Sequence, residues 1–189
     1  TDHPSMTAAL TLTKDGTAPG AGPRRQRRTL QDILAAQAEA IKTRYRISQP
    51  LLRRAMQDSP NESQSRLLLD RILQDVLGYE LGEIKTEQKI QGRIADYVLA
   101  PGGQEALVIE AKRLGAPLRD KQIFQATSYA AYAGLRWAVL TNVMTWQLYR
   151  VSTKDKVEAN LVFTLDLSNL DDESVYQHQP IDALVIQIG

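Results

Sequence analysis

Hydrophobic residues recur along the first part of the chain with the spacing of an α-helix. The pattern predicts an amphipathic helix that begins at Thr29 or Asp32 and ends near Arg46. Its apolar positions are Leu30, Ile33, Leu34, Ala38 and Ile41. Pro50 is expected to interrupt the helix, because proline lacks the N–H that the helical ladder needs, and residues 51–56 then form a separate short helix.

A second helical pattern lies between Asn61 and Gly78. Asn61 is suited to the N-cap, since its side-chain oxygen can accept a hydrogen bond from a free N–H of the first turn. Gly78 is suited to the C-terminal stop, because glycine readily adopts the left-handed conformation found there. The apolar positions of this predicted helix, over about 62–77, are Leu68, Leu69, Ile72, Leu73, Val76 and Leu77.

From residue 84 onward the pattern changes to the shorter apolar runs of β-strands. We predict strands over about 84–90, 93–99, 105–113, 136–141, 145–151 and 161–167. Pro101-Gly102-Gly103 joins the second strand to the third, and a helix over 119–133, ending at Gly134, separates the third from the fourth. This order predicts an α/β fold with a mixed central β-sheet flanked by helices. The last twenty residues receive no assignment.

Residues 1–28 differ in composition from the rest of the chain. They are rich in Thr, Ala, Gly and Pro and carry five basic against two acidic residues, hence +3, whereas the whole 189-residue chain is +1. We expect a disordered basic tail over 1–28 and one domain over 29–189, with a helical part at 29–58 and a core at about 60–152. The tail either contacts phosphates or is a solvated leader.

The residue inventory narrows the chemistry that the chain can perform. The sequence has no cysteine, which excludes thiolate catalysis and cysteine-type zinc sites, and only two histidines, His3 and His178. Carboxylate, lysine, tyrosine and hydroxyl groups remain. No stretch approaches the roughly 18 apolar residues of a membrane span, and no signal peptide begins the sequence, so we expect a cytoplasmic protein without membrane partners.

The main candidate for chemistry is a charged pair at the end of the third predicted strand. Glu110 and Lys112 follow the apolar run 106–109, and the alternation of side chains puts both on one face with Val108. Burying two charges on such a strand is costly unless they pair or bind an ion. A carboxylate that holds a divalent metal, with a lysine beside the attacking water, is a layout used by nucleases.

Asp96 supplies a second carboxylate on the neighbouring strand. Asp96 and Glu110 are symmetric about Gly103, so a hairpin loop of odd length centred on Gly103 places them directly opposite on one face, about 5 Å apart at Cβ. A two-residue loop would put them on opposite faces. Opposed carboxylates favour a cation between them, and Mg²⁺ prefers such ligands. The alternative is ordinary salt bridges at the rim, with Lys89, Arg93 or Arg113 as partners.

The series Glu62, Asp96, Glu110-Ala111-Lys112 and Gln125-x-x-x-Tyr129 resembles the PD-(D/E)xK nuclease superfamily. Within it, residues 60–150 look most like the N-terminal nuclease domain of type I restriction enzyme R subunits. Alanine precedes Asp96 where the superfamily is named for proline. The resemblance implies a restriction-endonuclease-like fold and a DNA endonuclease that depends on Mg²⁺, with Mn²⁺ able to substitute.

The resemblance also implies a role for each matching residue. Asp96 and Glu110 would be metal ligands, and Lys112 would position or activate the water and stabilise developing charge. Glu62 would help to bind or organise the metal from its helix, and it shares a helical face with apolar residues, so we expect it to point inward. The alternative for Glu62 is simpler, since an acidic residue in the first turn complements the helix dipole.

Gln125 and Tyr129 would lie one helical turn apart and face the site, supporting catalysis and DNA handling. Polar contacts of a helix that packs on the sheet explain the same spacing.

The sequence contains no Gly-x-x-x-x-Gly-Lys-Ser/Thr loop, so we expect no ATP motor in it. DNA is the expected partner, and a homodimer or association with restriction-modification subunits stays open. The alternative function is a catalytically silent module of the same fold that binds DNA or a partner; a purely structural interaction domain would leave the charged residues unexplained.

Overall fold

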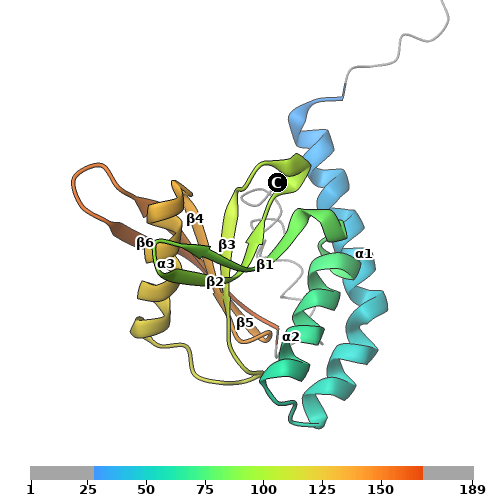
Figure 1. Ribbon diagram of the computed structural model, residues 1–189. Helices are drawn as coiled ribbons and strands as arrows, with labels where there is room; N and C mark the ends of the chain where they lie inside the picture. Colours follow the sequence, from blue (N-terminus) through green and yellow to red (C-terminus); the bar gives the residue numbers. More distant parts are fainter. Residues whose placement is uncertain (1–27, 168–189) are drawn as a thin grey trace, which may run out of the picture.

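One mixed β-sheet organises the chain in a computed structural model, which describes residues 28–167. Its strands lie side by side in sequence order (Figure 1): β1 (Ile84–Ile90), β2 (Arg93–Leu99), β3 (Leu107–Ala111), β4 (Trp137–Thr141), β5 (Thr145–Ser152) and β6 (Glu158–Asp166). β3 and β4 are parallel, and the other four neighbouring pairs are antiparallel. The predicted α/β class, with a mixed central sheet, is confirmed.

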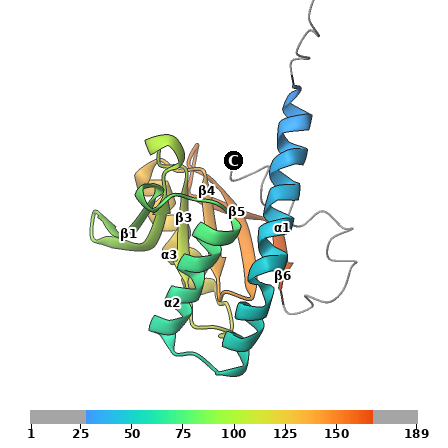
Figure 2. The ribbon, with the colours of Figure 1, turned by 90° about the vertical axis from the view of Figure 1, so that its right-hand side faces the viewer.

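The helices cover both faces of this sheet. α1 (Leu30–Gln57) and α2 (Glu62–Arg71) lie together on one face, and α3 (Asp120–Ala133), the crossover between the parallel strands, lies on the other (Figures 1 and 2). Alternating strand residues divide accordingly, since Ile109 packs in the α1–α2 core and Val108 in the α3 core. Among the described helices, none combines the length and apolar character needed to cross a lipid bilayer.

The predicted strand and helix boundaries are close to those of the structure. β1 and β2 have the predicted limits, whereas β3 is shorter than the predicted 105–113 and β6 begins earlier, at Glu158. α3 ends at Gly134, which has φ 71° as a left-handed cap requires. Residues 1–27, most of the predicted tail, and residues 168–189 lie outside the described residues.

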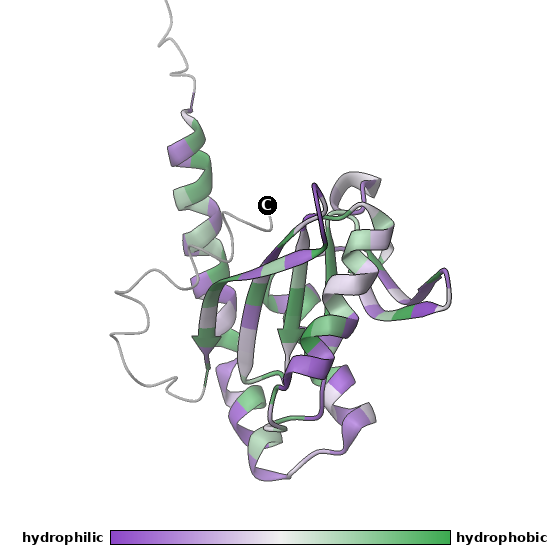
Figure 3. Ribbon diagram, turned by 90° about the vertical axis from the view of Figure 1, so that its left-hand side faces the viewer, coloured by the Kyte–Doolittle hydropathy of each residue, from purple (hydrophilic) through white to green (hydrophobic). Residues whose placement is uncertain are grey.

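The expected break at Pro50 is wrong, because α1 continues through Pro50 to Gln57. Residues before and after the proline are buried against the rest of the fold, namely Ala38, Ile41, Tyr45 and Leu52. This packing on both sides of Pro50 offsets the one hydrogen bond that the proline cannot donate. In Figure 3, α1 alternates hydrophilic and hydrophobic segments along its length, as an amphipathic helix does.

The second predicted helix is present and contains a feature that its pattern did not predict. Asn61 caps α2, and its side chain accepts a hydrogen bond from the Gln64 N–H, which confirms the predicted cap. After α2 the chain forms one π-helical turn, Ile72–Val76, before Gly78. Gly78 has φ 84°, and a Cβ there would lie 3.1 Å from the Arg44 guanidinium, so both conformation and space favour glycine.

Candidate active site

The β2–β3 hairpin brings the two candidate carboxylates to opposed positions. Its paired residues are Tyr97 with Ile109, Val98 with Val108 and Leu99 with Leu107, all symmetric about Gly103. Continued by one residue beyond the last of these pairs, the same register brings Asp96 opposite Glu110. The predicted odd-length loop centred on Gly103 is therefore confirmed. The ladder ends before Asp96 and Glu110, so their opposition on one face stays a prediction.

Asp96 stands where the backbone ladder between β2 and β3 stops. Its Oδ2 accepts a hydrogen bond of 2.8 Å from the Ala111 N–H of β3, so the carboxylate takes the place of a backbone carbonyl across the gap. Its Oδ1 accepts a second hydrogen bond, of 2.5 Å, from Arg66 Nη2 of α2. These two bonds satisfy a carboxylate that is only 9% exposed.

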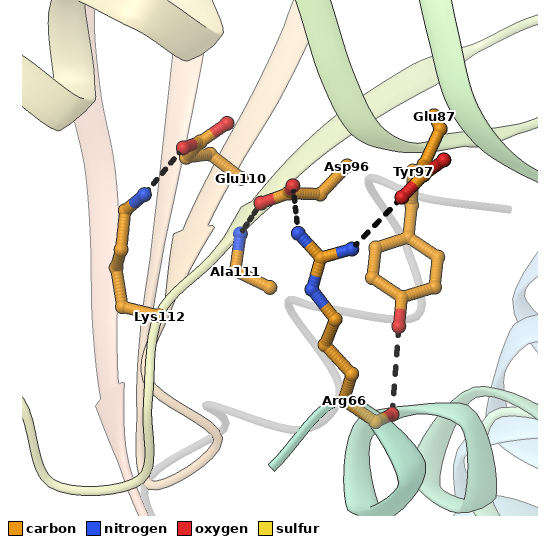
Figure 4. Close-up of polar contacts among 7 residues, drawn as sticks. All are labelled: Arg66, Glu87, Asp96, Tyr97, Glu110, Ala111 and Lys112. Carbon is orange, nitrogen blue, oxygen red and sulfur yellow. Dashed lines mark hydrogen bonds and ion pairs between the residues drawn. The ribbon is translucent and has the colours of Figure 1, made fainter. Parts of the chain in front are cut away.

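Glu110 and Lys112 form an ion pair at the end of β3 (Figure 4). Lys112 Nζ donates a hydrogen bond of 2.6 Å to Glu110 Oε1. Glu110 is 1% exposed, and this burial raises the pKa of its carboxyl; the bond from Lys112 acts in the opposite direction, and the charge of Asp96 adds to the rise. The predicted charged pair is thus present, with its carboxylate nearly removed from water.

Arg66 is a site residue that the sequence reasoning missed. Its guanidinium lies between two carboxylates, Asp96 and Glu87, with Nη1 3.8 Å from Glu87 Oε1. The Tyr97 hydroxyl donates a hydrogen bond of 3.4 Å to the Arg66 carbonyl and so ties α2 to β2. The signal that could have found it is the helical spacing, because Arg66 follows Glu62 by four positions and shares its face.

The expected inward orientation of Glu62 is wrong, because this residue is exposed in the first turn of α2. The helix reaches the sheet one turn later, where Ser65 is buried and Arg66 contacts Asp96. Among the described residues, no group of three or more His, Cys, Asp or Glu side chains is arranged to hold a metal ion. The ligand role of Glu62 therefore stays a prediction that its position does not support.

The structure does not gather Gln125 and Tyr129 with the carboxylates. Tyr129 is 4% exposed in the α3 core; burial raises its pKa, and the charge of Glu105 raises it further. Glu105 lies just before β3 begins, at the opposite end of that strand from Glu110. α3 runs back along β3, so each turn of the helix moves away from the site. Gln125 is exposed, and its side chain makes no hydrogen bond within residues 28–167.

The loop that follows Lys112 is held by two buried polar residues from other elements. The Leu114 N–H donates a hydrogen bond of 2.9 Å to Ser65 Oγ of α2, and Asn142 Nδ2 donates one of 2.7 Å to the Ala116 carbonyl. The sequence analysis assigned neither residue a role in the site. Their burial is a physical signal of a structural role, since buried polar groups need partners.

The donor set suits a divalent cation with few protein ligands. Asp96 and Glu110 supply two carboxylates from adjacent strands, and Mg²⁺ is commonly bound by one or two carboxylates with water and substrate phosphate completing its shell. Lys112 lies beside Glu110 and contributes a positive charge. The arrangement therefore fits metal-assisted attack on a phosphate, provided that Asp96 exchanges its contact with Arg66 for the cation.

Fold and site together define an α/β domain whose central strands end in a carboxylate–lysine cluster. Residues 61–164 match the family described as type I restriction enzyme R protein N terminus, and the chain belongs to this family. This confirms the resemblance drawn from the motifs, and Asp96, Glu110 and Lys112 all lie inside the matched range.

Solved structures and curated proteins give two further comparisons. Among solved structures, the type IIG restriction endonuclease BpuSI is similar over 66% of this chain, with 18% sequence identity and a TM-score of 0.44. The chain spans about 15% of the length of that enzyme. Comparison with curated proteins gives no match.

Proposed function

We propose that this chain is a metal-dependent deoxyribonuclease that hydrolyses phosphodiester bonds by water attack. The reaction would need no ATP motor within residues 1–189. The observation that carries the proposal is the burial of Glu110, which is 1% exposed, paired with Lys112 and opposed in register to Asp96. Burial of a carboxylate disfavours its ionised form, and a bound cation would restore it. Membership of a restriction enzyme family supports DNA as the substrate.

Each residue of the cluster has a role in this reaction. Asp96 and Glu110 would hold one Mg²⁺ or Mn²⁺ ion between β2 and β3. When bound, such an ion neutralises phosphate charge and lowers the pKa of its water. Lys112, fixed by its hydrogen bond to Glu110, would orient the attacking water and stabilise charge that develops on the phosphate. Restriction-modification subunits are the proposed protein partners.

A second function, a catalytically silent module that binds DNA or a partner, is favoured by one observation. Arg66 already neutralises Asp96, so the metal-free protein needs no cation at this residue. The two functions differ in what happens to DNA when a divalent cation is supplied.

The test is incubation of the protein with plasmid and linear DNA in Mg²⁺, in Mn²⁺ and with a chelator. We expect cleavage with either metal and none with the chelator. Binding of DNA without cleavage in both metals would overturn the nuclease proposal and support the silent module. Cleavage that persists in the chelator would overturn the metal dependence.

A further inference from the structure

We propose that Arg66 is a displaceable counter-ion of the metal site, which holds Asp96 in the metal-free protein and moves to Glu87 when a divalent cation binds. This rests on the proposed function, because it takes Asp96 and Glu110 as the ligands of that cation. It assigns a role to two residues, Arg66 and Glu87, that the motifs of the sequence did not single out.

The first observation is that one guanidinium faces two carboxylates (Figure 4). Arg66 Nη2 lies 2.5 Å from Asp96 Oδ1, and Nη1 lies 3.8 Å from Glu87 Oε1. The first contact is a charge-assisted hydrogen bond and the second is a looser ion pair. In the metal-free protein Arg66 is thus held mainly by Asp96, while a second carboxylate lies within reach of its other nitrogen.

The second observation is the conformation of Glu87. In the β1–β2 hairpin, Thr86 pairs with Tyr97 and Gln88 with Ala95, so Glu87 stands opposite Asp96 without joining the ladder. Its φ of 50° is left-handed, which is strained for a residue other than glycine in the middle of a strand. Such strain persists where the surroundings enforce it, and it is concentrated at functional sites.

The third observation is that the backbone of Arg66 is held in place independently of the partner that its guanidinium contacts. α2 is fixed against the sheet by buried Leu69 and by the bond from the Tyr97 hydroxyl to the Arg66 carbonyl. The side chain of Arg66 is 32% exposed and that of Glu87 is 74% exposed, whereas that of Asp96 is 12% exposed. A long side chain at the surface can therefore change partner while the helix stays in place.

The direction of the exchange follows from charge. A divalent cation carries twice the charge of the guanidinium and interacts with both Asp96 and Glu110, so it displaces Arg66 from Asp96. Glu87 then keeps Arg66 paired, which lowers the cost of the displacement. Removing Arg66 should consequently strengthen metal binding, and removing Glu87 should weaken it only while Arg66 is present.

The experiment is calorimetric titration of the full chain with Mn²⁺ alone. For Arg66→Gln we expect about tenfold tighter binding than for the wild type, since a hydrogen bond to a charged group shifts an equilibrium by roughly that factor. Arg71→Gln is the matched control, because Arg71 lies on the same helix and pairs with Asp75 at the surface, 3.2 Å away. Unchanged or weaker binding by Arg66→Gln would overturn the proposal.

A double-mutant cycle tests the part played by Glu87. Glu87→Gln should weaken Mn²⁺ binding several-fold in the wild-type background and leave it unchanged in the Arg66→Gln background. An equal loss in both backgrounds would show that Glu87 acts through its charge alone and would overturn its role as the receiving partner.

Asp96→Asn separates failure of this proposal from failure of the proposed function. If the wild type binds no Mn²⁺, or if Asp96→Asn binds it as the wild type does, the proposed metal site is wrong. If Asp96→Asn loses binding and Arg66→Gln matches the wild type, only the role of Arg66 is wrong. Should Arg66→Gln fail to show a cooperative unfolding transition, Arg66→Met replaces it, because methionine keeps an apolar stem of similar reach and removes the charge that faces Asp96. Binding no tighter than in the wild type would again overturn the proposal.

Discussion

Glu110 lies in the interior of the sheet with 1% of its surface exposed, and its charged neighbours shift the pKa of its carboxyl in opposite directions. Burial and the charge of Asp96 disfavour the ionised carboxylate, whereas Lys112 favours it. The net result is a raised pKa. Ionised Glu110 is therefore a source of instability in the metal-free protein and at the same time a metal ligand of the proposed site.

Glu110→Gln should make the metal-free protein more stable than the wild type at pH 7. In the unfolded chain Glu110 loses its proton at the ordinary pKa of glutamate, and in the folded chain only at a higher pH. The free energy of unfolding therefore falls as the pH rises from the ordinary pKa through the raised one. Towards the ordinary pKa of glutamate the advantage should disappear, since wild-type Glu110 is then protonated as well. Urea denaturation in a chelator, from pH 5 to pH 8, measures the difference.

Glu158→Gln is the control for this comparison, because Glu158 is an exposed carboxylate paired with Lys156 at 3.2 Å. We expect little change in stability across the same pH range. If Glu110→Gln were less stable than the wild type at pH 7 by the same margin as at pH 5, the cost assigned to ionised Glu110 would be wrong.

At the scale of the element, the sequence predicts what depends on local pattern and misses what depends on docking. The β2–β3 hairpin was predictable because alternation and a glycine-centred loop fix its register, and that register brings Asp96 opposite Glu110. Arg66 was missed as a site residue, since its helical spacing from Glu62 becomes a contact with Asp96 only once α2 lies against β2. Pro50 was misjudged for the same reason, because burial on both sides of it outweighs a local signal.

Pro50→Ala should stabilise the protein by about 1–3 kcal/mol. Alanine supplies the missing helical N–H and removes the steric conflict of the ring, while the greater freedom of the unfolded chain offsets part of the gain. Urea denaturation at pH 7 is the measurement. Thr43→Ala, an exposed change in the same helix, is the control; a Pro50→Ala protein no more stable than this control would contradict the role given to packing around Pro50.

Asn142→Asp should lower DNA cleavage more than it lowers stability. Asn142 Oδ1 accepts hydrogen bonds from the N–H groups of Met144 and Thr145, which aspartate can also do, but only the amide donates to the Ala116 carbonyl. Losing that bond releases the loop behind Lys112, and the charged oxygen repels the carbonyl. Asn160→Asp, on exposed β6, is the control; wild-type cleavage by a folded Asn142→Asp protein would refute the positioning role.

At the scale of the whole molecule, the N-terminal residues differ in charge from the rest of the sequence. Residues 1–28 carry a net charge of +3, and the remaining residues carry −2 to give the total of +1. A net charge this close to zero over residues 29–189 gives little general attraction for DNA. We therefore expect a divalent cation and the basic N-terminal residues to supply much of the affinity.

Deleting residues 1–28 should weaken DNA binding and flatten its dependence on salt. Every phosphate that the tail no longer neutralises removes about 0.9 from the slope of log affinity against log salt, and five basic residues are deleted. Fluorescence anisotropy with labelled DNA over a range of salt concentrations measures the slope. Cleavage at saturating DNA should persist; a slope equal to that of the full chain would show that these residues do not bind DNA.

The most direct test of the central claim is the rate of plasmid cleavage in Mg²⁺ by the wild type and by Asp96→Ala, Glu110→Ala and Lys112→Ala. Lys156→Ala and Glu158→Ala are matched controls, because they remove an exposed lysine–glutamate pair with the same two-residue spacing. We expect each of the three site variants to lose cleavage by a factor of about 100 or more, with both controls active as the wild type. Cleavage at the wild-type rate by a folded Glu110→Ala protein would contradict the assigned site.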